Sequence, residues 1–476
     1  MLPLSLGEIA QLVGGRLRDA DPGTVVSGSV EYDSRKLGPG GLFVAFPGEQ
    51  VDGHDYVRTA LDLGAVAAMT TRQVAGPRIE VADGLRALTA LASAVARRLP
   101  ATVIGITGSS GKTSTKDLLA QLLVLAGPTI APTGSMNNEL GHPYTVLRAD
   151  AQTRFLVLEL GARGIGQVRH LARIAPPRIG VVLNVGTAHV GLFGTREVIA
   201  RAKGELVESL PADGLAVLNA DDPLVLGMAA RTSARVVTVG ESADADVRAE
   251  DVTLDELGRP GFVLRAGGES ASVQLRLVGA QHVGNALAVV AVASAAGLSL
   301  SAVARALGAA VLTSRWRMEV TERNDGVTII NDAYNANPES TRAALEALAS
   351  LARTRRGIGG RSFAVLGPMA ELGRSELVEH NAVGRLAARL DIARVIAVGP
   401  AARPIQQAAA LEGSWGGDAQ WVPDVDAAVA ALRAQLRPGD VVLVKASRAA
   451  SLERVALAIA QDAVAGPEDE RGGGIG

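Results

Sequence analysis

ATVIGITGSSGKTSTKDLLAQLL, residues 101–123, decides the fold class of this chain. Its first seven residues, 101–107, form an apolar run, as expected of a strand buried on both faces of a parallel sheet. Residues 112–127 follow with the pattern of an amphipathic helix. The sequence Gly-Ser-Ser-Gly-Lys-Thr, 108–113, joins the two and opens the helix. A loop of small residues in this position predicts a phosphate site made of backbone N–H groups.

The residues of this loop suggest how it would hold ATP. Lys112 would contact the β- and γ-phosphates, and the Thr113 hydroxyl would ligate Mg²⁺. The other residues of the predicted ATP loop are Gly108, Ser109, Ser110, Gly111 and Ser114. The loop is shorter than the general G-x-x-x-x-G-K pattern, because position 106 is Ile106. A Gly/Ser turn that only caps a helix is the alternative.

The alternation of strands and helices continues on the C-terminal side of the loop. It predicts a doubly wound α/β sheet for a central P-loop ATPase domain, residues 101–312. Residues 246–278 change to short alternating strands, which predicts an antiparallel edge. Further apolar runs, each expected to be a strand, lie at 155–160, 178–186, 214–220 and 235–240.

Two smaller α/β units flank the central one. Residues 1–100 contain short strands and turns, with helices expected at 57–68 and 85–99. Residues 313–465 repeat the strand–helix alternation and predict a Rossmann-like C-terminal domain. The polar, glycine-rich end, 466–476, predicts a disordered tail.

Length and composition exclude several classes of protein. At about 150 residues per domain, 476 residues allow roughly three domains. A net charge of −2 gives no basic field for nucleic acid, and the absence of cysteine excludes thiolate nucleophiles and disulfides. The N-terminus shows no secretory signal, and the uncharged segment Ala286–Ala304 is interrupted by Gly297, which favours a pair of buried helices. We therefore expect a cytoplasmic protein without a membrane span.

Three polar residues in apolar surroundings are candidates for chemistry. Glu159 ends an apolar strand, where a carboxylate faces the ligand crevice and suits Mg²⁺, although an exposed strand-end Glu would look the same. His189 follows another strand, and a lone histidine is more often structural. Lys203 shares a helical face with Ile199, Leu206 and Leu210. Such a lysine either extends to solvent or has a lowered pKa and an available neutral amine.

The chain resembles the Mur ligase family along nearly its whole length. The segments that carry the resemblance are DSRK…DGHDY (33–56), TGSSGKTSTKD (107–117), NNELGHPYTVL (137–147), LELGARGIGQV (158–168), NVGTAHVGLFG (184–194), AKGEL (202–206), GAQHVGNALA (279–288), RWRMEV (315–320) and NDAYNANPES (331–340). The resemblance implies a UDP-binding N-terminal domain, a central ATPase domain and a C-terminal ligase domain.

The resemblance also implies roles for individual residues. It implies two Mg²⁺ ions held by Thr113, Glu159, His189 and a Lys203 carbamoylated by CO₂, with Lys112, Glu159, His189 and Lys203 as the catalytic group. It assigns to ATP the residues Asn138, His282, Asn285, Arg317 and Asp332. Expected to contact the other substrates are Asp33, Ser34 and Arg35 at the UDP group, and Tyr334, Asn335, Asn337, Lys445, Ser447 and Arg448 in the C-terminal domain.

Two C-terminal motifs narrow the expected reaction. DAYNANP (332–338) and GPMAELG (367–373) favour the family member that adds D-alanyl-D-alanine to UDP-N-acetylmuramoyl-tripeptide. ATP would convert the peptide carboxylate to an acyl phosphate, which the amine of the dipeptide would attack. Three departures from the family pattern are Val283, Pro368 and the Arg-Trp-Arg hinge at 315–317, where Arg317 aligns better than Arg315. We expect a monomer with no nucleic-acid partner.

Two other functions compete with this interpretation. The first is a ligase of the same core that adds a single amino acid such as diaminopimelate or lysine, against which the missing Asn-Pro-Arg motif argues, since Glu339 follows the only Asn-Pro. The second is a P-loop nucleotide switch without ligase activity. The DSRK segment and Lys203 argue against the switch.

Overall fold

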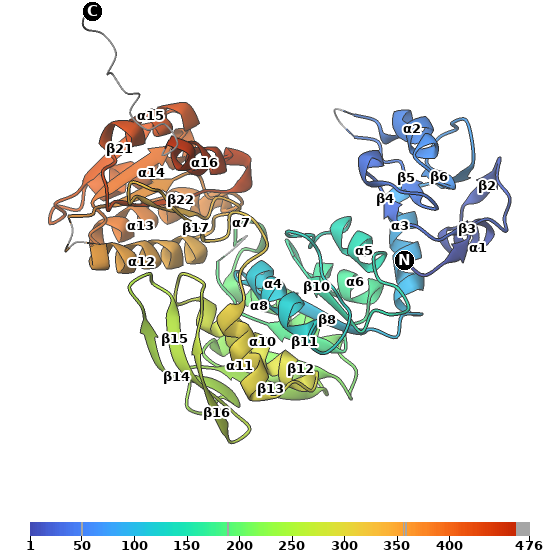
Figure 1. The fold of residues 1–476 in the computed structure, drawn as a ribbon, viewed down its shortest axis with the longest axis horizontal. Helices are drawn as coiled ribbons and strands as arrows, with labels where there is room; N and C mark the ends of the chain where they lie inside the picture. Colours follow the sequence, from blue (N-terminus) through green and yellow to red (C-terminus); the bar gives the residue numbers. More distant parts are fainter. Residues whose placement is uncertain (49–50, 188–189, 356, 358, 463–476) are drawn as a thin grey trace, which may run out of the picture.

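In the computed structural model the chain forms three α/β domains arranged as the arms and base of a V (Figure 1). The structure describes residues 1–48, 51–187, 190–355, 357 and 359–462. The central domain is the base, and the N- and C-terminal domains stand apart above it (Figure 1). The predicted disordered tail lies outside the described residues, so it stays a prediction.

The N-terminal domain is built on a five-stranded sheet of order β2-β7-β6-β5-β4. All neighbours in it are parallel except β2 and β7. A second, two-stranded sheet pairs β1 with β3. The elements are β1 Leu4–Ser5, α1 Leu6–Val13, β2 Arg16–Arg18, β3 Val25–Val26, β4 Val30–Glu31, β5 Leu42–Val44, α2 Val57–Asp62, β6 Ala67–Thr70, β7 Arg78–Glu80 and α3 Gly84–Ala96.

The prediction of one helix over residues 57–68 is correct for the first half of this range and wrong for the second half. Helix α2 ends at Asp62, and strand β6 begins at Ala67. Gly64, with φ +103°, turns the chain between them, a conformation that glycine adopts without strain. Residues 67–70 are buried along their whole length in the sheet, so the apolar run that suggested a helix is a strand.

The central domain confirms the doubly wound sheet and its antiparallel edge. Its nine strands have the order β16-β15-β14-β13-β12-β11-β8-β10-β9, and only the β14–β15 and β15–β16 pairs are antiparallel. The strands are β8 Thr102–Thr107, β9 Thr129–Ile130, β10 Phe155–Glu159, β11 Ile179–Val182, β12 Leu215–Asn219, β13 Arg235–Gly240, β14 Val247–Leu254, β15 Pro260–Ala266 and β16 Glu269–Gln274. The helices are α4 Lys112–Leu123, α5 Gly141–Val146, α6 Gln167–Ile174, α7 Val190–Phe193, α8 Arg196–Glu208, α9 Pro223–Leu226, α10 His282–Ala295 and α11 Leu300–Ala309.

Separate apolar cores cover the two faces of the central sheet. Helices α4, α10 and α11 pack on one face, and α10 is buried along most of its length. Helices α6 and α8 pack on the other face, in a core that continues into α3 of the N-terminal domain. The segment Ala286–Ala304 is therefore a pair of helices, α10 and α11, broken at Gly297 (φ +93°), as predicted. Among the described residues, no helix is long and apolar enough to cross a membrane.

The C-terminal domain has a six-stranded sheet of order β17-β18-β22-β19-β20-β21. All of its pairs are parallel except β17–β18, and buried clusters cover both faces. The elements are β17 Glu319–Glu322, β18 Thr328–Asn331, α12 Pro338–Arg355, β19 Ser362–Leu366, α13 Glu376–Arg389, β20 Arg394–Val398, α14 Arg403–Ala410, β21 Asp418–Val422, α15 Val425–Gln435, β22 Val441–Lys445 and α16 Glu453–Gln461.

The connection into the C-terminal domain is tied to the helix that follows the phosphate loop. Asp117 in α4 accepts the backbone N–H groups of Thr313 and Ser314, at 3.1 and 2.8 Å. Lys116 beside it donates to the carbonyl of Pro132 (2.9 Å) and pairs with Asp117. Both side chains are buried, so this contact fixes where the C-terminal domain begins relative to the phosphate loop.

Candidate active site

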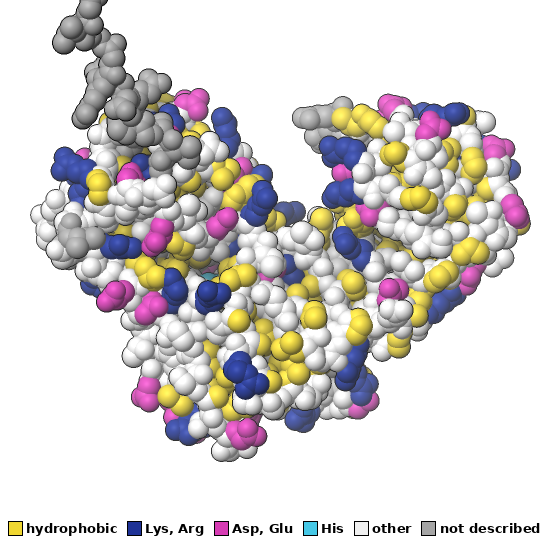
Figure 2. All heavy atoms as spheres, viewed as in Figure 1, with side chains coloured by type: hydrophobic (Ala, Val, Ile, Leu, Met, Phe, Trp, Pro, Cys, Tyr) yellow, Lys and Arg dark blue, Asp and Glu magenta, His cyan; other side chains and the backbone are white. Residues whose placement is uncertain are grey.

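The main cavity lies where the central and C-terminal domains meet. Its volume is about 580 Å³. The space-filling view shows a wide hollow between the two arms (Figure 2). Lys and Arg side chains gather on the walls of this hollow (Figure 2). The cavity lies at the carboxyl ends of the parallel strands, where open α/β sheets bind their ligands.

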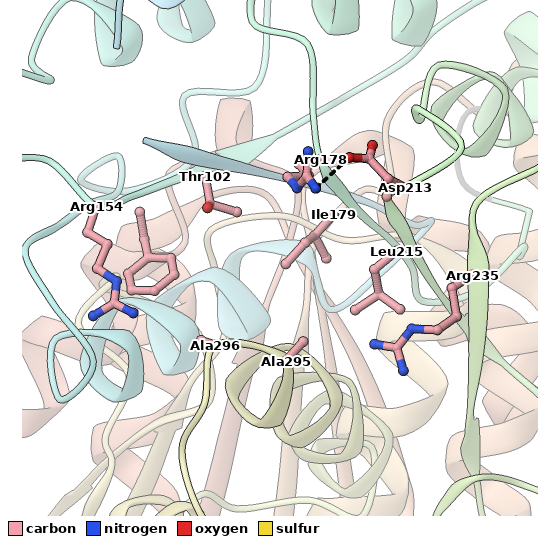
Figure 3. Close-up of a pocket in the computed structure, with 11 residues that line it drawn as sticks. Thr102, Arg154, Arg178, Ile179, Asp213, Leu215, Arg235, Ala295 and Ala296 are labelled. Carbon is pink, nitrogen blue, oxygen red and sulfur yellow. Dashed lines mark hydrogen bonds and ion pairs between the residues drawn. The ribbon is translucent and has the colours of Figure 1, made fainter. Parts of the chain in front are cut away.

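A second cavity, of about 290 Å³, lies at the other end of the central sheet (Figure 3). It is lined by the first residues of five strands, namely Thr102, Phe155, Ile179, Leu215 and Arg235. Arg178 on its rim is paired with Asp213 at 2.7 Å (Figure 3). Because it lies at the amino ends of the strands, it is separated from the phosphate loop by the length of the sheet.

The phosphate loop is held in shape by Asn184, at the end of the neighbouring strand. Its Oδ1 accepts the backbone N–H groups of Ser109 and Ser110, both at 2.9 Å. The Ser109 hydroxyl accepts the N–H of Gly186 at 2.9 Å. Lys112 donates to the carbonyl of Gly108 at 2.6 Å, so its ammonium lies over the loop. Asn184 was not among the predicted site residues. Its position directly after a buried strand could have identified it, because Glu159 was predicted from its position at the end of an apolar strand.

Gly111 gives the loop a conformation that other residues rarely adopt. Its φ is +81°, and a methyl group there would collide with Oδ1 of Asn285. We predict that Gly111→Ala lowers the free energy of unfolding by about 1–3 kcal/mol and raises the KM for ATP. Gly268→Ala is the matched control, because Gly268 has φ +83° with open space around it. An unchanged KM for ATP in Gly111→Ala would contradict this role.

Glu159 and Thr113 meet at the end of strand β10. The Thr113 hydroxyl donates to Oε2 of Glu159 at 3.2 Å, and the Ser135 hydroxyl donates to the same oxygen at 3.1 Å. Oε1 is buried and has no hydrogen-bond partner in the part of the chain that the structure describes. Burial raises the pKa of Glu159, against the opposing charges of Lys116, Lys112 and Arg317. A buried carboxylate with an unused oxygen beside a hydroxyl fits the oxygen ligands that Mg²⁺ requires.

The lysines of this chain are concentrated at the site. They are Lys36, Lys112, Lys116, Lys203 and Lys445. Lys116, Lys203 and Lys445 are buried, Lys112 is half-buried, and only Lys36 is exposed. Arginine cannot give up its proton or carry the chemistry of a free amine, whereas a buried lysine can. Three of the five lysines, Lys112, Lys203 and Lys445, line the main cavity.

Lys203 lies in helix α8, on the face that is packed into the core, and also lines the cavity. Burial lowers its pKa well below the usual value, the charge of Lys112 lowers it further, and Glu339 opposes the shift. This shift favours the neutral amine over the ammonium. Burial also lowers the pKa of Lys112 to about 8, with Glu159 raising it and Arg317 lowering it.

The C-terminal domain closes the cavity with residues near its first strand. Arg317 stacks over the ring of Tyr334 (4.1 Å to the centroid) and donates to the Thr113 hydroxyl at 3.3 Å. Asn337 donates to the carbonyl of Ser109 at 3.4 Å. The predicted ATP residues of the two domains are thus brought into contact across the domain boundary.

A buried ion pair lies behind this wall. Lys445 at the end of β22 donates to Asp332 at 2.5 Å and to the carbonyl of Asn335 at 2.9 Å. Arg448 pairs with Glu453 at 2.6 Å and stacks over Trp316. Lys445 was expected to contact a substrate, and in this structure its ammonium is paired with Asp332.

Most predicted site residues line the same cavity. Those that line it are Gly108, Ser109, Ser110, Gly111, Lys112, Thr113, Ser114, Asn138, Lys203, His282, Asn285, Arg317, Asp332, Tyr334, Asn335, Asn337, Lys445, Ser447 and Arg448. His189 lies outside the described residues. The group predicted at UDP lies in the N-terminal domain, where Arg35 is exposed and bound to Asp33 at 2.8 and 2.9 Å, and Ser34 is buried.

A third cavity, of about 470 Å³, extends the site along the interdomain connection. It shares His282, Arg317 and Met318 with the main cavity. Its walls also include the apolar side chains of Leu257, Leu277, Val278, Val311 and Leu312. No sequence motif pointed to this cavity, because its walls come from separate parts of the chain.

The fold and the site define a P-loop protein whose C-terminal domain completes the nucleotide cavity, and sequence comparison identifies the class. The Mur ligase middle domain matches residues 106–293, the "Mur ligase, glutamate ligase domain" matches 316–448, and the "Mur ligase family, catalytic domain" matches 23–96. The chain belongs to the Mur ligase family.

Particular relatives are similar over almost the whole chain. The UDP-N-acetylmuramoyl-tripeptide--D-alanyl-D-alanine ligase of Mycobacterium tuberculosis H37Rv is 50% identical, covering 98% of this chain and 99% of the relative. The protein of that name from Escherichia coli K12 is 32% identical, covering 97% of this chain and 99% of the relative. A crystal structure of MurF from Acinetobacter baumannii superposes with a TM-score of 0.83 at 30% identity, covering 95% and 98%. The structure of MurF ligase from Thermotoga maritima, solved in complex with ADP, superposes with a TM-score of 0.78 at 31% sequence identity. The match covers 92% of this chain and 98% of that one.

Proposed function

We propose that this chain is an ATP-dependent ligase that joins D-alanyl-D-alanine to UDP-N-acetylmuramoyl-tripeptide. The products are UDP-N-acetylmuramoyl-pentapeptide, ADP and phosphate, in the synthesis of peptidoglycan precursors. The observation that carries the proposal is one cavity that combines the phosphate loop, the buried Lys203 and the polar residues of the C-terminal domain. Relatives with this activity in their name match 98% of the chain at 50% identity.

The reaction proceeds in two bond exchanges. An oxygen of the terminal tripeptide carboxylate forms a bond to the γ-phosphorus of ATP, and the bond to ADP breaks. The dipeptide nitrogen then bonds to the acyl carbon, phosphate leaves with the electron pair of the C–O bond, and the nitrogen loses its extra proton. Negative charge develops on the phosphoryl group first and on the tetrahedral carbon centre afterwards.

Positively charged and N–H groups of the chain would stabilise this negative charge. The backbone N–H groups of the loop and the ammonium of Lys112, which line the cavity, would surround the β- and γ-phosphates. We propose that Arg317, held over Tyr334, adds a second cation from the C-terminal domain. The cavity along the interdomain connection, which His282 lines, would take the nucleoside. Asn285 and Asp332 line the adjoining main cavity. The N-terminal residues Asp33, Ser34 and Arg35 would take the UDP group.

Two Mg²⁺ ions are part of the proposal, since bound Mg²⁺ would neutralise the phosphate oxygens. Thr113 and Glu159 would hold one, on the strength of the unused Glu159 oxygen. His189 and Lys203, the latter as a CO₂-derived carbamate, would hold the other. We also propose that the enzyme acts as a monomer in the cytoplasm.

Oxygen exchange tests this mechanism. The tripeptide substrate would carry ¹⁸O in both oxygens of its terminal carboxylate. We expect one ¹⁸O in the released phosphate and the other in the new amide, because the acyl oxygen that attacks phosphorus leaves with it. Phosphate without ¹⁸O would exclude an acyl phosphate. A panel of single amino acids, including diaminopimelate and lysine, would distinguish a ligase with a different acceptor.

A further inference from the structure

Glu339, the second residue of helix α12, reaches from the C-terminal domain into the central domain. Its Oε1 accepts the backbone N–H of Thr187, in the loop after strand β11. The approach is possible because the residue before Thr187 is Gly186, where a methyl group would collide with the Glu339 carboxyl group. A carboxylate of one domain is thereby placed against the backbone of another, in the wall of the main cavity.

The contact leaves two buried acceptors unused. Within the described part of the chain, Oε2 of Glu339 and Oγ1 of Thr187 are both buried without a hydrogen-bond partner. A carboxylate oxygen only accepts hydrogen bonds, and a threonine hydroxyl can accept as well as donate. Burying such atoms unpaired costs free energy. Glu339 lines the main cavity, so a hydrogen-bond donor bound there would recover the cost of its unpaired oxygen.

The charges around Glu339 favour a cationic donor at this place. Burial raises the pKa of Glu379 in α13, and the negative charge of Glu339 raises it further, with Arg342 and His380 opposing. Elsewhere the cavity is lined by the cations Lys112, Arg317 and Arg448. Of the other carboxylates that line the cavity, Asp332 pairs with Lys445, Glu371 pairs with Arg163, and Glu139 is exposed. Glu339 therefore differs from them in having a buried carboxylate oxygen without a hydrogen-bond partner among the described residues.

We propose that Glu339 Oε2 and the Thr187 hydroxyl bind the α-ammonium of the incoming dipeptide. This inference rests on the proposed function, and it identifies the group of the dipeptide that the site recognises. The ammonium is the only cationic group of D-alanyl-D-alanine, and charge-assisted hydrogen bonds to a carboxylate are strong and directional. The nitrogen of this group must be bound near the acyl carbon before the second bond exchange takes place. Glu339 meets this need because it lines the same cavity as Lys112 and Lys203.

Two reactions of the same enzyme separate this role from others. Hydroxylamine, which is mostly neutral near pH 7.5, would trap the acyl phosphate formed from ATP and UDP-N-acetylmuramoyl-tripeptide without any dipeptide. We expect Glu339→Gln to raise the KM for D-alanyl-D-alanine at least tenfold, while hydroxamate formation stays within about twofold of wild type. Glu346→Gln, the same change at an exposed position of α12, is the control and should alter neither.

A ligand without the amino group gives a second readout. Wild type should bind D-alanyl-D-alanine more tightly than propionyl-D-alanine, and Glu339→Gln should lose most of this preference. Thr187→Val, which keeps the shape of the side chain, should lose part of the preference for D-alanyl-D-alanine. It tests the same contact independently if Glu339→Gln does not fold. Thermal unfolding would be followed for both variants.

Three results would overturn the inference. The first is an unchanged KM for the dipeptide in Glu339→Gln. The second is an equal loss of hydroxamate and amide formation, which would assign Glu339 to metal binding or to domain closure. The third is a wild type that forms hydroxamate but no amide with the dipeptide, which would overturn the proposed acceptor and the inference with it.

Discussion

Replacing Lys203 with alanine should reduce kcat for ligation by about 10³-fold or more, because an anion that would hold a metal at the γ-phosphate is lost. The residue is buried in α8 beside the cavity, and burial lowers its pKa. A neutral amine reacts with CO₂, and the resulting carbamate is anionic. Lys203→Arg should be as inactive as Lys203→Ala, because a guanidinium keeps the positive charge and forms no carbamate.

Small carboxylates and isotopes check this role of Lys203. Acetate or formate should restore part of the activity of Lys203→Ala by occupying the space of the lost carbamate, and should not restore Lys203→Arg, whose side chain fills it. Wild type in ¹³C-bicarbonate should show a ¹³C resonance of a carbamate that Lys203→Ala lacks. Activity of Lys203→Arg near the wild-type rate would contradict the account.

Replacing Lys112 with methionine should have an effect of similar size on phosphoryl transfer. Its ammonium lies over the phosphate loop, where it donates to the carbonyl of Gly108 at 2.6 Å. Methionine keeps the length of the side chain and removes the charge that would stabilise the transferring phosphoryl group. We expect kcat for phosphate release to fall by about 10³-fold.

Lys112→Met should leave the fold intact, because the only hydrogen bond that the described structure gives this side chain joins it to the loop itself. Thermal unfolding would check that the melting temperature is close to wild type. A kcat within tenfold of wild type, at saturating ATP, would show that Lys112 does not contact the reacting phosphates.

The parts of the site that lie at strand ends could be predicted from the sequence. An apolar strand followed by Gly-Ser-Ser-Gly-Lys-Thr identified the phosphate loop, and Glu159 was found because a carboxylate ended a buried strand. Both features are local, so residues close in sequence carry the whole signal. Asn184 has the same signal, and its role became clear only from its bonds to Ser109 and Ser110.

The contacts between domains could not be predicted, because they join residues far apart in the chain. Glu339 and Thr187 are separated by 152 positions, and no periodicity links them. The pairing of Lys445 with Asp332 likewise depends on β18 and β22 being neighbours in the sheet. The helix expected over 57–68 failed for a related reason, since Gly64 and the neighbouring strands decide the structure of residues 67–70.

Release of phosphate from ATP tests the central claim most directly. The purified chain would be given Mg²⁺ and ATP with UDP-N-acetylmuramoyl-tripeptide, with D-alanyl-D-alanine, and with both. The account predicts sustained release only with both, together with a product heavier than the tripeptide substrate by one dipeptide less water. Release that needs neither substrate would contradict it and favour a nucleotide switch, and release with a single amino acid in place of the dipeptide would contradict the assigned acceptor.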